Sequence, residues 1–219
     1  MNYKTYQDLR ARYFEAVDEE AVTILYSGVP IRKSADSTYV FESNHNFSYL
    51  SGLTEEAAIL VLDSRDQSSI LFVRDIDPFK EKWMGYFIQP EVAKTISGIE
   101  DVRFFSEFEA YLAEVLASDV KVGLDFDHDV LDDAIQAGPY SLIEEIEDDS
   151  RVLDVFPLLT SLRMVKHPDE VEAIKHALKV TNTAIEAALS DMVPGANEND
   201  LAARFQYEGM KQGGDLMLD

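Results

Sequence analysis

Cysteine is absent from all 219 residues, which excludes disulfide frameworks, cysteine-ligated zinc, iron–sulfur clusters and thiol nucleophiles. The sequence also lacks an apolar run near the ~20 residues that a membrane-spanning helix needs. Its first twenty residues, MNYKTYQDLRARYFEAVDEE, are charged throughout and predict an amphipathic helix instead of a signal peptide. We therefore expect a cytoplasmic protein that does not bind membranes.

Basic residues are scarce. There are 19 Lys and Arg against 42 Asp and Glu, for a formal net charge of -23. Nucleic acids and anionic membranes are bound by Lys and Arg clustered on one face, so this charge balance argues against both. The hydrophobic fraction of 46% is sufficient for a globular core. Enzymes that act on small molecules or peptides remain compatible with this composition.

Several catalytic motifs are missing: the sequence has no P-loop, no GxGxxG, no GxSxG elbow and no HExxH. The segment DFDHDVLDD, residues 125–133, alternates carboxylates around His128 and could bind a divalent cation. Counted from Asp125, however, Val130 and Gln136 occupy the places where a calcium loop needs Gly and Glu. We interpret the segment as a strand-to-helix turn whose acidic residues cap the next helix.

Strands alternate with helices along the first 156 residues. Short apolar runs predict strands at 21–28, 57–63, 69–75, 102–105, 121–125 and 151–155. Helical spacing predicts helices at 6–17, 90–96 and 106–117, the last with a capping box from Ser106 to Glu109. This order predicts an α/β domain with helices on both faces of the sheet. A hairpin between the second and third strands makes the sheet mixed.

The sequence pattern changes after residue 156, from alternating strands and helices to long helices. Pro168 begins a long amphipathic helix, whose apolar stripe includes Val171, Ile174, Leu178 and Ile185. Pro194-Gly195 ends this helix and Asn197 caps another. We predict two domains, residues 1–156 and residues 157–219, the second of which looks incomplete.

The last five residues, DLMLD, predict the beginning of a strand. Asp215 and Asp219 are four apart, so both side chains would leave the same face and could ligate a metal. The ordinary alternative is that they are the polar ends of a strand.

The stretch FESNHNFSYLSGL, residues 41–53, connects the chain to a known family. Its Phe41, Asn46-Phe47, Tyr49-Leu50 and Ser51-Gly52-Leu53 resemble the N-terminal domain of aminopeptidase P and its relatives, the creatinase/prolidase group of metallopeptidases. Further matches run along the chain: Leu71-Phe72-Val73-Arg74, Asp77-Pro78, Glu81-x-Trp83-x-Gly85, and Leu162-Arg163-x-x-Lys166-x-x-x-Glu170-x-x-x-Ile174. The resemblance implies a creatinase/prolidase-type domain, followed by the helical start of a truncated "pita-bread" domain.

Within the opening stretch, Phe47, Leu50 and Leu53 fit a short packed helical turn. Asn44 or Ser43 would cap this turn and Gly52 would end it. His45 is then a surface or interface group and not a catalytic one. The stretch is expected to be mainly scaffold.

The family resemblance implies a peptidase with two divalent metals, usually manganese, bound by two Asp, one His and two Glu in the second domain. In the reaction that the resemblance implies, a water activated by the metals would attack the scissile carbonyl, and the first residue would be released from peptides with proline in second position. GGDLMLD resembles a ligand strand of the family but follows the Asn197 helix too early, so Asp219 is placed in the strand before the site. We assign no catalytic residue and no metal ligand, and we expect this fragment alone to be inactive.

The resemblance also implies that the N-terminal domain shapes the active-site mouth and builds a homodimer or higher oligomer. The loop with Trp83, Met84 and Gly85 would reach towards a neighbouring subunit, making Trp83 the candidate substrate-lining residue across the interface. An ordinary packing or interface aromatic is the alternative.

Because the second domain is expected to be incomplete, its apolar stripe should be exposed. Either two copies of the chain pair through this stripe, or the C-terminal third is mobile. Two other functions stay open. One is a prolidase that cleaves only dipeptides, and the other is a non-enzymatic oligomerisation or binding module of the same fold.

Overall fold

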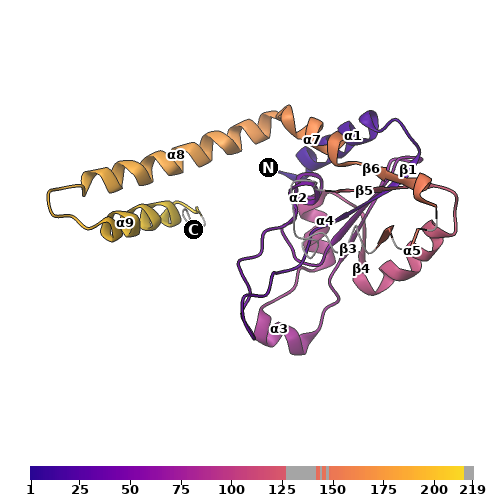
Figure 1. Ribbon diagram of the computed structural model, residues 1–219, viewed down its shortest axis with the longest axis horizontal. Helices are drawn as coiled ribbons and strands as arrows, with labels where there is room; N and C mark the ends of the chain where they lie inside the picture. The colour runs from indigo at the N-terminus through magenta and orange to yellow at the C-terminus, as the bar shows by residue number, and fades with distance from the viewer. Residues whose placement is uncertain (127–141, 144, 147, 215–219) are drawn as a thin grey trace. The chain divides into compact units, whose positions relative to one another are not determined.

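The computed structural model describes residues 1–126, 142–143, 145–146 and 148–214. The chain forms two compact units, Met1–Val165 and Lys166–Asp219 (Figure 1). The domain boundary predicted after residue 156 stays a prediction.

A six-stranded mixed sheet forms the centre of the first unit, in the order β4-β3-β2-β1-β5-β6. Strand β1 pairs antiparallel with β2, and β2 with β3, while the pairs β1–β5, β3–β4 and β5–β6 are parallel. This confirms the predicted mixed sheet and its hairpin. The strands are β1 (Ala21–Tyr26), β2 (Ile59–Asp63), β3 (Ser68–Val73), β4 (Asp101–Phe104), β5 (Lys121–Leu124) and β6 (Val152–Asp154).

Helices cover both faces of the sheet, which is why its central strands are almost continuously apolar. Leu25, Leu60 and Leu71 pack on one face against α1 (Tyr3–Ala16), α2 (His45–Ser51), α4 (Pro90–Ser97) and α7 (Phe156–Met164). Ile24 and Phe72 point to the other face, against α5 (Phe108–Leu116). Each fully buried side chain of this size contributes about 1.5–3 kcal/mol of transfer free energy. The predicted fold class is confirmed.

Arg10 of α1 is a buried cation with a structural task. Its guanidinium donates to the carbonyl oxygens of Leu50 (2.7 Å) and Ser97 (2.8 Å), near the C-terminal ends of α2 and α4. Carbonyls at helix ends have no partner within their helix, so Arg10 satisfies acceptors that would otherwise be buried alone. Burial lowers the pKa of Arg10 to about 10, so the side chain stays charged at neutral pH.

Helix α2 has the caps that its sequence predicts. The Asn44 side chain accepts hydrogen bonds from the backbone of Asn46 (2.8 Å) and Phe47 (3.0 Å). Gly52 ends the helix with φ +76°, a conformation that residues with a Cβ adopt only with strain. Phe47, Leu50 and Leu53 are buried, which confirms that this stretch is a packing element.

The capping box predicted from Ser106 to Glu109 is wrong. Ser106 lies inside a 3₁₀ turn, η1 (Phe105–Glu107), and the N-cap position of α5 is Glu107, which makes no side-chain capping bond. The Ser106 hydroxyl donates instead to Asp75 Oδ1 at 2.6 Å, and its backbone N–H donates to Asp75 Oδ2 at 3.0 Å. A second 3₁₀ turn, η2 (Asp149–Arg151), leads into β6.

The second unit contains two helices that pack together, α8 (Pro168–Ser190) and α9 (Glu198–Lys211). Both begin as predicted, α8 with Pro168 in its first turn and α9 with Asn197 accepting from the Asn199 N–H at 2.9 Å. The predicted apolar stripe of α8 is largely exposed, with Leu178 57% accessible. In the part of the chain that the structure describes, no helix is both long and apolar enough to cross a membrane.

Candidate functional site

Trp83 lies on a short helix, α3 (Pro78–Met84), and not in the loop expected from the sequence. Asp77 caps this helix by accepting from the N–H groups of Phe79 (3.0 Å) and Lys80 (3.3 Å). Proline suits the first helical turn because it lacks an N–H that would be unpaired there anyway. The Asp77-Pro78 dipeptide is therefore the signal that could have identified α3 from the sequence.

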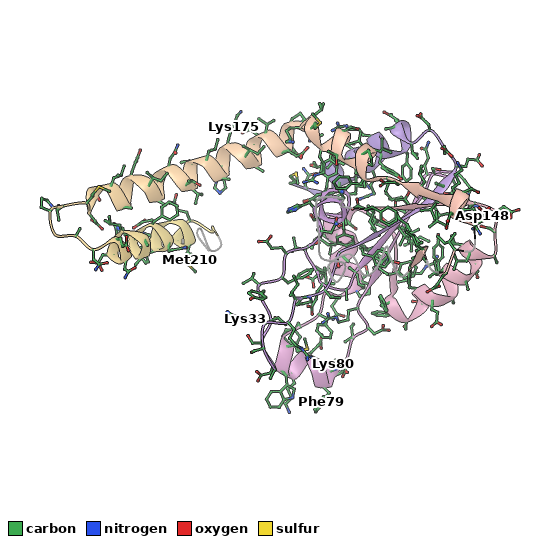
Figure 2. All side chains as sticks on the ribbon, in the orientation of Figure 1. Lys33, Phe79, Lys80, Asp148, Lys175 and Met210 are labelled. Carbon is green, nitrogen blue, oxygen red and sulfur yellow. The ribbon has the colours of Figure 1, made fainter. Side chains whose placement is uncertain are left out.

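The side chains of α3 form an exposed aromatic surface. The exposed fractions are 74% for Phe79, 79% for Trp83, 63% for Met84 and 94% for Tyr86, the second residue after the helix. We call these four residues the aromatic tip. Single exposed apolar residues are common, but four within eight positions of the chain make this segment a candidate interaction surface. Figure 1 shows α3 at the end of the first unit away from α1 and α7, and Figure 2 shows Phe79 and Lys80 at its outer surface.

The aromatic tip is also electrically balanced, in contrast to the chain as a whole. Between residues 77 and 85, the positive charges of Lys80 and Lys82 balance the negative charges of Asp77 and Glu81, whereas the whole sequence has a formal net charge of -23. Another acidic molecule is repelled less at a surface without net charge than at the acidic remainder of the chain.

A small group of contacts lies at the base of the aromatic tip. Arg74, which follows β3, forms an ion pair with Glu56, and its guanidinium lies 4.7 Å from the centre of the Phe87 ring. The Glu81 carboxylate accepts from the Phe87 N–H at 3.0 Å, which ties α3 to the segment that follows it. A hollow of about 140 Å³ opens here, lined by Glu55, Glu56, Arg74, Met84, Tyr86, Phe87 and Ile88.

Glu55 is the perturbed titratable group of this hollow. Its burial disfavours the charged form and raises the pKa of the carboxyl group, while the charge of nearby Arg74 acts in the opposite direction. Perturbed carboxyl groups occur at both functional and structural sites, so this shift alone assigns no catalytic role.

A second polar group is buried between three distant segments, at Asn46, Asp125 and Arg163. The Asn46 amide donates to both carboxylate oxygens of Asp125, at 2.9 and 3.1 Å, and its own oxygen accepts from Arg163 Nη1 at 3.0 Å. Asn46 is 3% exposed and Asp125 6% exposed. We call these residues the Asn46 network, which joins α2, the end of β5 and α7. The Asp125 carboxylate therefore has a structural role.

Neighbouring contacts hold the last turn of α7. The Tyr49 hydroxyl donates to the Leu162 carbonyl at 3.3 Å, and Arg12 Nη2 donates to the carbonyls of Leu162 and Val165, both at 3.2 Å. These hydrogen bonds satisfy carbonyl groups at the C-terminal end of α7, a helix that has no glycine cap. The first and last segments of the family resemblance therefore meet in one structural cluster.

The remaining candidates divide into those that the structure describes and those that it does not. His45 is exposed at the first position of α2, as expected. His128, Asp215 and Asp219 lie outside the described residues, as does most of the 125–133 segment. Among the residues that are described, no group of three or more His, Asp or Glu side chains could hold a metal ion.

Residues 6–122, just over half of the chain, match the family model "Aminopeptidase P, N-terminal domain". The chain is 26% identical to the Xaa-Pro aminopeptidase of Escherichia coli over 221 residues, covering 95% of this chain and 49% of that protein. It is 30% identical to human Xaa-Pro aminopeptidase 3 over 210 residues, covering 90% of this chain and 40% of that protein. The chain thus spans about half the length of the curated relatives it matches, or less.

Solved structures agree with this match. A Bacillus anthracis structure with a provisional aminopeptidase P assignment superposes with a TM-score of 0.86 at 28% identity, covering 97% of this chain and 52% of that one. Escherichia coli aminopeptidase P with the inhibitor Pro-Leu gives a TM-score of 0.81 at 25% identity, covering 97% of this chain and 50% of that one. With its mixed sheet, the helices on both faces and these matches, the chain belongs to the aminopeptidase P family and carries that family's N-terminal domain.

Proposed function

We propose that this chain is the N-terminal portion of a metallo-aminopeptidase that releases the first residue from peptides with proline in second position. Curated relatives named Xaa-Pro aminopeptidase support the proposal, since they match over 90% or more of this chain. The proposed parent enzyme acts in the cytoplasm and continues beyond the region described, into a pita-bread domain that contains the reaction centre.

Within this enzyme, the aromatic tip is proposed to complete the active-site mouth of a neighbouring subunit. The observation that carries this role is the 79% exposure of Trp83 on a capped helix. Aromatic residues are enriched and charges depleted at the centre of protein interfaces. A charge-balanced tip is therefore a surface by which one strongly acidic copy can approach another. Trp83 would offer its flat ring to the apolar ring of the substrate proline.

Among the described residues, no group of three or more His, Asp or Glu side chains could bind a metal ion. These residues therefore do not form the metal site of the proposed reaction. Two divalent metal ions, manganese in the first instance, would activate a water molecule in the complete enzyme. We assign no chemical step to the side chains described here. Their proposed contribution is oligomerisation and the shape of the substrate entrance, so the 219-residue chain alone should be inactive.

The activity is tested on the complete reading frame that contains this chain, expressed with manganese. Substrates are a Xaa-Pro dipeptide and a longer peptide with proline in second position. Release of the first residue from the longer peptide supports an aminopeptidase, whereas cleavage of the dipeptide alone indicates a prolidase. A folded, metal-loaded protein that cleaves neither contradicts the proposal and favours a non-enzymatic oligomerisation or binding module.

The role of the tip is tested with Trp83→Ala in the same protein. We expect an increase in KM for the longer peptide, because an apolar wall of the entrance is lost. Tyr3→Ala on α1 is the matched control, since Tyr3 is also exposed, at 54%, but lies outside the tip. Equal kinetics for both variants would refute a substrate contact by Trp83. Sedimentation of the 219-residue chain tests self-association separately, and a rigid monomer would count against it.

A further inference from the structure

Helix α3 is attached to the domain by its ends. None of its seven side chains, all of which the structure describes, is buried. An amphipathic helix normally gains its orientation by burying an apolar face, and α3 lacks such a face. The direction in which the aromatic tip points therefore depends on the contacts just before and just after the helix.

The entry to α3 is held by Asp75. Its carboxylate accepts two hydrogen bonds from Ser106, at 2.6 Å from the hydroxyl and 3.0 Å from the N–H, and Asp77 then caps the helix. These contacts define where the helix begins. They leave its far end, which carries Trp83, free to swing unless that end is also held.

The exit from α3 is held by Arg74. Its guanidinium lies 4.7 Å from the Phe87 ring centre and pairs with Glu56, and both charged side chains are only about one quarter exposed, at 25% and 24%. Arg74 directly follows β3 (Ser68–Val73), an internal strand of the sheet, so its backbone is held next to the end of that strand. A planar guanidinium can lie with its flat face against a ring and pair with a carboxylate through its edge, whereas a lysine ammonium has no flat face.

A further contact carries this attachment into the helix itself. Glu81, in the middle of α3, accepts from the Phe87 N–H at 3.0 Å. Arg74 holds the Phe87 ring and Glu81 holds the Phe87 backbone, so Phe87 links the sheet to the helix. Trp83 is two residues from Glu81 and four from Phe87.

We propose that Arg74 is a positioning residue for Trp83. Its stacking on Phe87 and its ion pair with Glu56 anchor the exit of α3 to the sheet and thereby set the direction of the aromatic tip. This inference deepens the proposed function, because it concerns the residue that would line the substrate entrance. The physical anchoring can be tested independently of catalysis.

The test uses the fluorescence of Trp83, which is the only tryptophan in the sequence and therefore reports on the tip without a label. Time-resolved anisotropy is measured on the 219-residue chain and on Arg74→Met. We expect the amplitude of nanosecond local motion at Trp83 to increase at least twofold. Arg74→Lys should loosen the tip similarly, because the charge remains but the planar stack is lost.

Arg103→Met is the matched control. Arg103 also pairs with a carboxylate, Asp101, and lies over two rings, 6.0 Å from Phe72 and 5.8 Å from Tyr111, but it belongs to β4 and not to the base of α3. Its substitution should leave the anisotropy of Trp83 unchanged. Equal loosening in both variants would show a general loss of rigidity and overturn the proposal.

Two further measurements keep the result decisive. Phe87→Leu removes the ring but keeps apolar bulk and the Arg74–Glu56 pair, so it should also loosen the tip, and it replaces Arg74→Met should that variant fail to fold by circular dichroism. Unchanged anisotropy in a folded Arg74→Met or Phe87→Leu protein would overturn the proposal. In the complete enzyme, Arg74→Met should raise KM while kcat stays within about twofold. Loosening without that KM effect would support the anchoring and contradict the substrate contact of Trp83.

Discussion

Replacement of Asn46 by leucine should destabilise the first unit, because it removes buried polar contacts. Leucine has the same number of side-chain heavy atoms and the same branching, so the core stays filled while the amide is lost. Asn46 is 3% exposed, donates to Asp125 at 2.9 and 3.1 Å, and accepts from Arg163 at 3.0 Å. The substitution therefore removes polar contacts to two charged groups at a buried position.

The magnitude follows from those contacts. A hydrogen bond to a charged group contributes about 1.5–3 kcal/mol, and contacts to two such groups are lost. Asp125 and Arg163 have other interactions, so neither becomes an isolated buried charge. Burial of the leucine side chain offsets about 1.5–3 kcal/mol. We expect the free energy of unfolding to fall by about 1.5–3 kcal/mol.

Native-state hydrogen exchange of the amides in β1 is the suitable assay, because amides of a central strand exchange only when the whole unit opens. Asn44→Ala is the matched control, since it removes the cap of the same helix and should cost only about 1 kcal/mol. A double-mutant cycle with Arg163→Met should give a coupling energy of about 0.5–3 kcal/mol. An Asn46→Leu variant no less stable than Asn44→Ala, with no coupling to Arg163, would refute the importance of the network.

Three other substitutions test the packing and the titration of the first unit. Gly52→Ala should lower the free energy of unfolding by about 1–3 kcal/mol through backbone strain alone. The added Cβ would also lie 2.4 Å from the Tyr6 ring, so thermal unfolding should show a clearly lower Tm. Tyr13→Phe removes a buried 2.5 Å hydrogen bond to Thr23 and should cost about 1–3 kcal/mol in urea denaturation. Burial raises the pKa of Tyr13 to about 12, so the parent protein should lose stability as the pH rises from 10 towards 12, and the variant should lose less. Glu55→Gln should raise the Tm at pH 7, because burial raises the pKa of this carboxyl group and disfavours its charged form. The gain in Tm should vanish below about pH 4, where Glu55 of the parent protein is protonated in both the folded and the unfolded state. An unchanged pH dependence in either of the last two variants would contradict the corresponding shift.

Local patterns were sufficient for most elements of the fold. The apolar runs at residues 21–28 and 57–63 predicted β1 and β2, and the three- and four-residue spacing after Pro168 predicted α8. Asn44 and Gly52 identified both ends of α2. These predictions succeed because alternation, helical periodicity and capping depend on neighbours within a few positions of the chain. The error at Ser106 concerns the exact start of a helix. The error at Trp83 is a missed short helix, α3, which has no buried apolar face to produce a helical pattern in the sequence.

The order of the family motifs along the chain was sufficient to indicate the aminopeptidase P family, although no single motif carried the assignment. Tertiary structure alone decided which polar side chains meet. Asn46 lies 79 positions from Asp125 and 117 from Arg163, and their contact depends on β5 lying beside β1 and on α7 returning to α2. Arg74, Glu56 and Phe87 likewise meet only because β2 and β3 pair and the chain after α3 folds back onto them. Periodicity shows which face of an element is buried, but the partner of a buried polar group depends on how the elements pack.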